Sequence, residues 1–272
     1  ADVDHFIALK EEVNDIKVLD QSYRIPGGPI HELSQNIINK VQNRFDKDYK
    51  PRDDEGILKR YSDITQVDMS KGNWLVLSSA NYFLDDAKDL CEIQGWYYQF
   101  KGRNSIPLKL LMALNNWEAW RKDAQLNHLE IKNIYEYLGS HVLPGFQKGK
   151  TLHSDTKYLM RDCRAEHGLV TDSVWYEAFE GLDPMTETYI RNMRANGEMI
   201  NKNPRIIMST IHGAKGGEAD KVLLMQDITN AALETFSHDP DELHRLFYTG
   251  ATRAKRELHV LDPKDFDRAY IL

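Results

Sequence analysis

Two kinds of hydrophobic pattern alternate along this chain of 272 residues. Short, continuous apolar runs bounded by polar or glycine-rich segments predict buried β-strands, whereas apolar residues spaced by three or four positions predict amphipathic helices. The runs lie at residues 74–78, 96–100, 205–210, 221–226 and 257–261, and a further short strand is predicted at residues 57–61 within an otherwise polar stretch. The clearest helical spacing is that of Ile30, Leu33, Ile37, Val41 and Phe45. Together the two patterns predict an α/β protein.

The strands at 74–78 and 96–100 carry a signal for their relative direction. A helix predicted over residues 82–93, and ended by Gly95, separates the two strands. A strand, a helix and a second strand in this order form a parallel pair with a right-handed crossover. Since the later strands extend the same pattern, we expect a parallel sheet flanked by helices.

Residues 105–201 differ from the rest of the chain because helical spacing runs through nearly all of them. Examples are Leu108, Leu111, Met112 and Asn115, then Ile131, Ile134, Tyr135 and Leu138. Since strands resume at residue 205, we interpret the stretch as a mainly helical insertion that divides the sheet domain into residues 1–104 and 202–272. Its aromatic residues share the helical spacing, which favours core packing over base stacking. They are Trp117, Trp120, Tyr135, Tyr137, Trp175 and Tyr176.

Composition and charge limit the classes of protein and the cellular location that fit this chain. A hydrophobic content of 41% is enough to fill a core. No apolar run approaches the roughly 18 residues that span a bilayer, and the N-terminus lacks a signal-peptide layout, so we expect a cytoplasmic protein without membrane contact. Cys91 and Cys163 lack C-x-x-C spacing and are expected to be reduced, buried thiols. A net charge of −7 argues against a nucleic-acid coat protein but permits a local DNA-binding groove.

Two arginines stand at places that suit phosphate binding. Residues 242–255 read E-L-H-R-L-F-Y-T-G-A-T-R-A-K, which puts Arg253 between a predicted helix and a buried strand. Arg24 likewise follows a short apolar run within residues 19–25, which read L-D-Q-S-Y-R-I. A guanidinium held at the rim of a sheet keeps its charge and can bind two phosphate oxygens at once. Taken alone, Arg253 could equally complement the helix dipole with its basic neighbours.

A glycine-rich loop lies between the two arginines in sequence. Residues 205–224 read R-I-I-M-S-T-I-H-G-A-K-G-G-E-A-D-K-V-L-L, a strand, a loop and a second strand. The glycines let the backbone approach a ligand closely, and successive N–H groups can form an anion-binding nest. In this order, the three segments resemble motifs IV, V and VI of the UvrD/Rep/PcrA-type superfamily 1 DNA helicases. The resemblance implies a RecA-like sheet, of the P-loop NTPase type, with an accessory subdomain inserted into it.

Three positions depart from the family pattern. Ser22, Ile25 and Gly217 stand where the pattern has Asn, Ser and Leu. None of these changes removes a charged group. We expect altered hydrogen bonding around the first two residues and a more loosely packed loop around the third.

The resemblance implies a nucleotide site of which this chain provides one half. Arg24 and Arg253 match the arginines that reach the γ-phosphate of ATP in the family, and Glu218 matches the residue that contacts the ribose. Further candidates for nucleotide contact are Tyr23, Lys215 and Gly216. An arginine finger stabilises charge that develops in the transition state and is worth on the order of 10³ to 10⁵ in rate. The alternatives are surface or dipole-capping arginines, and a plain acidic loop residue beside Lys221.

The resemblance also implies contacts to single-stranded DNA. Thr210 and His212 match motif positions that face the strand, one offering a hydroxyl to phosphate and the other an imidazole to phosphate or base. Ser79 and Asn81 follow the strand at 74–78, where the family touches the DNA backbone, although this match is weaker. A structural histidine at a strand end is the alternative for His212.

Two elements of a complete ATPase do not occur in the sequence. It has neither the G-x-x-x-x-G-K-[ST] loop that cradles phosphates nor an acidic pair after an apolar strand for magnesium and the attacking water. Residues 53–55 are acidic, but we interpret them as a solvated loop. We therefore expect the C-terminal part of an ATP-dependent DNA helicase that acts on single-stranded and duplex DNA, in repair or replication. Its Mg²⁺ ligands are expected on an absent N-terminal RecA-like domain, without which it should be inactive, and no metal site is expected in this chain.

Two alternative functions stay open. The chain could be the helicase region of a recombination helicase-nuclease subunit, although no nuclease-like cluster of Asp, Glu and Lys follows the last motif. It could also be a non-catalytic module whose helical insertion docks a partner protein. In that case Arg24, Glu218 and Arg253 would have no nucleotide to serve.

Overall fold

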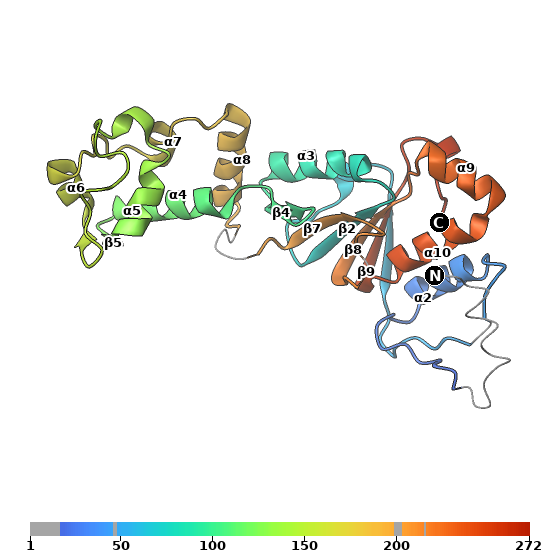
Figure 1. The fold of residues 1–272 in the computed structure, drawn as a ribbon. Helices are drawn as coiled ribbons and strands as arrows, with labels where there is room; N and C mark the ends of the chain where they lie inside the picture. Colours follow the sequence, from blue (N-terminus) through green and yellow to red (C-terminus); the bar gives the residue numbers. More distant parts are fainter. Residues whose placement is uncertain (1–16, 46–47, 199–202, 215) are drawn as a thin grey trace. The chain divides into compact units, whose positions relative to one another are not determined.

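The six predicted strand segments and the short β4, which the sequence pattern does not indicate, form a seven-stranded sheet with the order β1-β9-β8-β2-β7-β3-β4 (Figure 1). The strands are β1 Ile57–Tyr61, β2 Trp74–Ser78, β3 Tyr98–Phe100, β4 Arg103–Asn104, β7 Ile206–Thr210, β8 Ala219–Met225 and β9 Ala254–Leu261. The pairings from β1 through to β3 are parallel. This computed structural model describes residues 17–45, 48–198, 203–214 and 216–272. The predicted α/β fold with a mostly parallel, RecA-like sheet is confirmed.

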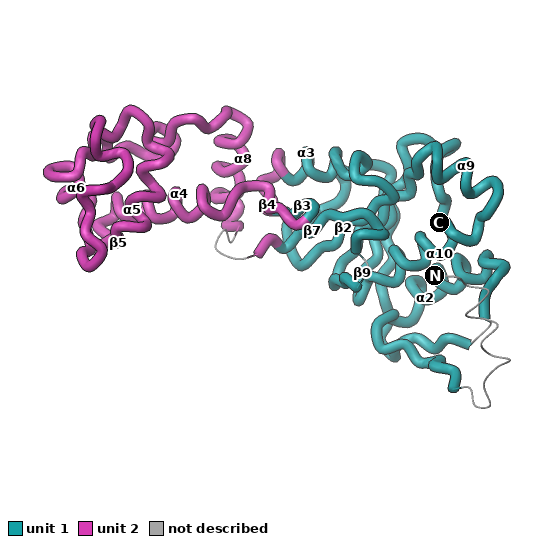
Figure 2. The backbone as a smooth tube through the Cα atoms, viewed as in Figure 1, with its two compact units in different colours: residues 1–91, 98–101, 205–272 teal, residues 92–97, 102–204 magenta. Residues whose placement is uncertain are grey.

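The chain divides into two compact units, which Figure 2 distinguishes by colour. Unit 1 comprises residues 1–91, 98–101 and 205–272, and unit 2 comprises residues 92–97 and 102–204. The helices of unit 1 are α2 Pro29–Ile38, α3 Asp85–Gln94, most of which belongs to this unit, α9 Asn230–His238 and α10 Pro240–Ala251, with short 3-10 helices at Ile64–Gln66, Asn81–Leu84 and Phe266–Arg268. Unit 1 therefore contains all three motif segments of the sequence.

The predicted crossover between β2 and β3 holds, with one addition. Both strands run parallel, and α3 lies between them in sequence. In space, however, β7 occupies the position between them and pairs with each. The strand that follows the insertion in sequence thus completes the middle of the sheet.

One face of the sheet packs against α2 and α10. Alternate residues of a strand point to the same face, and those of β2, β8 and β9 meet the apolar stripes of the two helices. The shared core includes Leu75, Leu77, Val222, Leu224, Leu258 and Val260 from the strands with Ile30, Leu33, Ile37 and Phe247 from the helices. Gly250 allows the close approach, because a Cβ there would lie 2.9 Å from Leu224 Cδ1. The core thus fixes both helices on the sheet.

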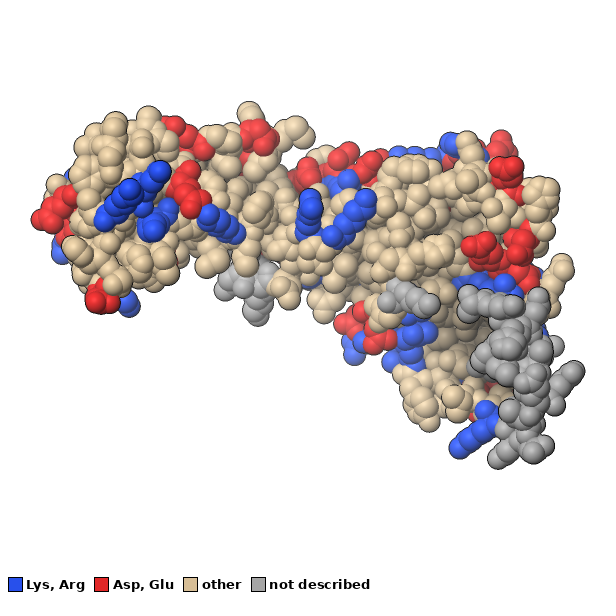
Figure 3. Space-filling model, viewed as in Figure 1, with Lys and Arg blue, Asp and Glu red and all other residues tan. Residues whose placement is uncertain are grey.

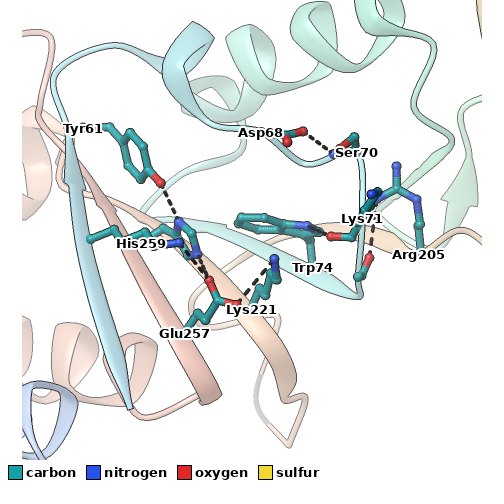
Figure 4. Close-up of polar contacts among 11 residues, drawn as sticks. Tyr61, Asp68, Ser70, Lys71, Trp74, Arg205, Lys221, Glu257 and His259 are labelled. Carbon is teal, nitrogen blue, oxygen red and sulfur yellow. Dashed lines mark hydrogen bonds and ion pairs between the residues drawn. The ribbon is translucent and has the colours of Figure 1, made fainter. Parts of the chain in front are cut away.

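The opposite face of β9 carries a polar network around the buried His259 (Figure 4). The His259 ring is stacked on the Tyr61 ring, and its Nδ1 lies 3.1 Å from the Tyr61 hydroxyl. Its Nε2 lies 3.2 Å from a Glu257 carboxylate oxygen, and the same carboxylate pairs with Lys59 and Lys221. Burial lowers the pKa of His259. Both ring nitrogens have partners, so the network joins β1, β8 and β9 without leaving a group for a ligand.

Helix α2 is shorter than the sequence pattern predicts. It ends at Ile38, so Val41 and Phe45 lie beyond it. The Asp241 carboxylate, at the start of α10, accepts the backbone N–H groups of Gln42 and Asn43, each at 2.8 Å. These N–H groups would otherwise continue the helix. The carboxylate therefore turns the chain and ties the end of α2 to the start of α10.

Unit 2 is mainly helical. Its elements are α4 Leu108–Trp120, α5 His128–Tyr135, α6 Met160–Glu166, α7 Trp175–Ala178 and α8 Pro184–Ala195, with a 3-10 helix at Gly139–His141 and a small antiparallel pair of β5 Leu126–Asn127 and β6 Lys157–Tyr158. The antiparallel pair is not apparent in the sequence pattern. Trp117, Trp120, Tyr135 and Trp175 are buried, as core packing requires, and Tyr137 is half-buried. Tyr176 is exposed, and the Arg191 guanidinium lies 3.8 Å from its ring centroid.

The cysteines and the surface agree with the composition. Cys91 and Cys163 are free and buried, and burial raises the pKa of the Cys163 thiol to about 12. On the face drawn in Figure 3, Lys and Arg side chains are interspersed with Asp and Glu. None of the helices in the described ranges combines the length and the apolar character needed to cross a bilayer.

Candidate functional site

The amino ends of β8 and β9 bring two of the predicted residues together. Glu218 directly precedes β8 and Arg253 directly precedes β9, and the two strands pair in parallel from Ala219 and Ala254 onward. The half-buried Arg253 side chain reaches back along α10, where its Nε donates to the Thr249 carbonyl at 3.1 Å. A longer contact of 3.4 Å joins its Nη1 to the Gly217 carbonyl. The guanidinium is thus held at the rim of the sheet by the end of the helix and the loop.

Arg24 reaches the same edge from the segment before α2. The buried Ser22 hydroxyl accepts the N–H groups of Arg24 and Ile25 at 3.2 and 2.9 Å, so a serine forms the tight turn here in place of the family's Asn. The charge of Arg24 is close enough to lower the pKa of Glu218, and the pKa of Arg253 is lowered first by burial and then by the same charge. The two guanidinium groups therefore share one electrostatic environment.

Arg24 retains a hydrogen-bond donor that the described residues do not use. Among the described residues, Arg24 Nε is buried without a hydrogen-bond partner. A buried, unpaired donor on a charged group is costly. Two like charges in proximity add to that cost. An anion bound beside the two guanidinium groups would offset the repulsion between them.

Glu218 has a partner that motif reasoning did not assign. The Lys255 ammonium lies 2.6 Å from a Glu218 carboxylate oxygen. The hydrogen bond from Lys255 is the main cause that holds the pKa of Glu218 below its usual value, and the charges of Lys255, Arg24 and Arg253 add to it. Glu218 therefore stays ionised at neutral pH and can accept hydrogen bonds from hydroxyl groups.

The remaining nucleotide candidates are less defined. Tyr23 is 87% exposed beside Arg24. Gly216 is exposed and has a backbone φ of 89°, in the left-handed region that favours glycine. Lys215 lies outside the described residues. Within the described part of the chain, no cluster of three His, Cys, Asp or Glu residues could hold a metal ion.

The predicted DNA-contacting residues meet at the other edge of the sheet, at the carboxyl ends of β2 and β7. Ser78 and Thr210 are register partners, so Ser79 and Asn81 follow one strand where His212 follows its neighbour. The Ser79 hydroxyl already donates to the Asp227 carbonyl at 2.8 Å. The Thr210 hydroxyl accepts the Gly213 N–H at 3.0 Å. The two hydroxyls thus shape the backbone, whereas the His212 side chain is exposed.

One segment connects the two edges. Residues 211–218 leave the carboxyl end of β7 and return to the amino end of β8, passing β2, which lies between these strands. Ile211 and Ala214 of this segment are buried in the core with α2 and α10. The segment is therefore fixed at its start, and its last residues border Arg253.

Comparison with known families agrees with this geometry. Residues 181–262 match the UvrD-like helicase C-terminal domain. The matched residues include 211–218, with Glu218, and Arg253. The match confirms the resemblance to the C-terminal region of UvrD/Rep/PcrA-like helicases. A function of the helicase class, with DNA interaction, follows from it. No curated protein matches the chain.

Proposed function

We propose that this chain is the second RecA-like lobe of an ATP-dependent DNA helicase or translocase. Its amino edge supplies Arg24 and Arg253 to the γ-phosphate of Mg²⁺-ATP, whose phosphate loop and magnesium ligands belong to a partner RecA-like domain. The observation that carries the proposal is the convergence of two arginines on one edge, with a donor of Arg24 left unpaired among the described residues.

In this proposal each residue has a distinct task. The two guanidinium groups bind phosphate oxygens and stabilise the charge that develops during transfer. Glu218 accepts hydrogen bonds from the ribose hydroxyls, since its carboxylate remains ionised. Loss of the γ-phosphate removes the anion that offsets the repulsion between Arg24 and Arg253, so the cleft between the two lobes opens after hydrolysis.

The same cycle acts on DNA through the 211–218 segment. Its start presents His212 beside Ser79 and Asn81, and its end borders Arg253. A shift of Arg253 on nucleotide binding can thus change the grip on single-stranded DNA at the opposite edge of the sheet. Repeated cycles would move the lobe along the strand and force the duplex apart.

The test is DNA-stimulated ATP turnover with the phosphate-loop domain present. Arg253→Ala is expected to lower kcat by on the order of 10³-fold or more while nucleotide binding is largely kept, because the guanidinium acts on transition-state charge. Arg256→Ala is the matched control, since Arg256 is exposed and only three residues away. Equal turnover of the Arg253→Ala variant and the parent would refute the proposed role.

A further inference from the structure

The polar stretch before β1 is the backbone support of Arg24. The Ser22 N–H donates to the Lys50 carbonyl at 2.7 Å, the Arg52 N–H to the Ile25 carbonyl at 2.9 Å, and the Gly27 N–H to the Asp54 carbonyl at 2.8 Å. Residues 50–56 thus run alongside residues 20–27. The side chains of residues 53–55 are exposed, as the solvated-loop interpretation expects, but the backbone of this stretch is paired.

Arg52 extends this support to the second arginine segment. Its Nη2 donates to the Lys255 carbonyl at 2.6 Å, and Lys255 lies two residues after Arg253. The Asp54 carboxylate holds the same nitrogen at 2.7 Å. Arg52 therefore bonds through its backbone to the residue after Arg24 and through its side chain to the strand that begins after Arg253.

We propose that Arg52 is a positioning residue that holds the two arginine fingers at a fixed separation. This inference rests on the proposed function, because it assigns Arg52 a role in the same nucleotide site. Burial is the main cause that lowers the pKa of Arg253, and the nearby positive charge of Arg24 lowers it further, so the two charges repel one another. The contacts of Arg52 with Ile25 and Lys255, called here the Arg52 brace, oppose that repulsion when no phosphate is bound.

The side-chain chemistry of arginine suits this task. Its planar guanidinium offers several donors in fixed directions, so it can bind a carbonyl and a carboxylate at once. Both contacts are made by Nη2, whose N–H directions are fixed by the guanidinium plane, whereas the ammonium of a lysine rotates freely and can donate to the Lys255 carbonyl without that fixed direction. We therefore expect Arg52→Lys to restore part of what Arg52→Met loses.

The first test measures turnover with the phosphate-loop domain present. A displacement of about 1 Å in a catalytic group can cost on the order of 10²-fold in rate. Arg52→Met is expected to lower kcat by that order with little change in KM, and Arg52→Lys to lower it less. Arg60→Met, an exposed arginine of β1, is the matched control and should leave kcat unchanged. A rise in KM at unchanged kcat would overturn the positioning role.

A second comparison separates positioning from general stability. If Arg52 acts through the fingers, Arg52→Met should cost much less in an Arg253→Ala background than in the parent, because residues that act as a unit have non-additive effects. An equal fold-loss in both backgrounds would mean that Arg52 acts independently, and the proposal would fail.

A third arm needs no turnover and uses the chain alone. Hydrogen exchange followed by mass spectrometry should show faster exchange in peptides covering residues 22–28 and 252–257 of the Arg52→Met variant, under conditions where urea denaturation shows it folded. Faster exchange confined to residues 50–56, or none, would overturn the brace. Asp54→Asn, which removes the carboxylate that orients Arg52, serves if Arg52→Met does not fold. If the parent shows no ATPase, the proposed function fails, while this arm still decides the brace.

Discussion

The two edges of the sheet shift the pKa of a carboxyl group in opposite directions. At the amino edge, the hydrogen bond from Lys255 and the nearby arginines hold the pKa of Glu218 below its usual value. At the carboxyl edge, burial raises the pKa of Asp227 above its usual value. The difference shows that cations stabilise the ionised Glu218 at the amino edge, whereas Asp227 at the carboxyl edge is disfavoured as an anion by its own burial.

The polar side chains of the two edges differ in the same sense. Arg24 at the amino edge keeps a donor that has no partner among the described residues. At the carboxyl edge, Ser79 and Thr210 use their hydroxyls on the protein's own backbone. The amino edge is therefore prepared for a charged ligand. The carboxyl edge has its hydroxyls committed to the fold, and in the proposed function the exposed His212 is its contact with nucleic acid.

The difference between the two edges can be tested by substitution, and the larger expected effect is that of Thr210→Val. Thr210→Val keeps the side-chain shape but removes the acceptor of the Gly213 N–H, so we expect a loss of about 0.5–1.5 kcal/mol in the free energy of unfolding, measured by urea denaturation. Single-stranded DNA affinity, measured by fluorescence anisotropy, should fall as well because the loop that carries His212 loosens.

Thr235→Val is the matched control for this measurement. The Thr235 hydroxyl donates to the Ala231 carbonyl one turn earlier in α9 and is exposed, so its loss should change stability little. If Thr210→Val weakens DNA binding at unchanged stability, the hydroxyl faces DNA and does not shape the loop.

A smaller expected effect is the pH dependence of stability, to which Glu218 at the amino edge and Asp227 at the carboxyl edge contribute with opposite signs. The ionised Glu218 stabilises the fold above its unfolded pKa of 4.5, and this contribution is lost as pH falls through the lower folded value. Asp227 has the opposite effect, because its folded pKa lies above its unfolded pKa of 3.8. The fold therefore loses stability as pH rises from 3.8 through the folded pKa of Asp227. At pH 7, Glu218→Gln should therefore be less stable than the parent and Asp227→Asn more stable.

Urea denaturation at pH 3 and pH 7 checks these directions. Both differences from the parent should shrink as pH falls from 7 to 3, because the unfolded Glu218 and the folded Asp227 become protonated over this range. Asn at position 227 can still accept the Lys264 N–H, which Asp227 accepts at 2.9 Å, so the substitution tests the charge alone. A destabilised Asp227→Asn variant at pH 7 would contradict the contrast between the edges.

Much of the fold could be predicted because its signals are local. The strands predicted at residues 57–61 and 74–78 are β1 and β2 with the same bounds. Arg253 lies between α10 and β9, as the pattern indicates. The end of α2 and the central place of β7 could not be predicted. Both depend on partners distant in sequence, namely the Asp241 carboxylate for α2 and the neighbouring strands for β7.

The candidate site also contains residues that could be predicted from the sequence and residues that could not. Arg24, Glu218 and Arg253 were identified from motifs, since each motif fixes a residue at the end of a strand or helix. The partners Lys255 and Arg52 were not, because an ion pair and a bond to a carbonyl 203 residues away leave no local pattern. The solvated-loop interpretation of residues 53–55 did not indicate that the Asp54 carbonyl accepts the Gly27 N–H or that the Asp54 carboxylate binds Arg52.

The account rests on Arg24 and Arg253 acting together on one phosphate. The most direct test is single-turnover ATP hydrolysis, with the phosphate-loop domain and single-stranded DNA present, for Arg24→Ala, Arg253→Ala and the double variant. The account predicts that each single variant loses most of the activity and that the second substitution adds much less than its own single loss. A double variant whose loss equals the product of the two single losses would show that the arginines serve separate tasks, which contradicts the shared site.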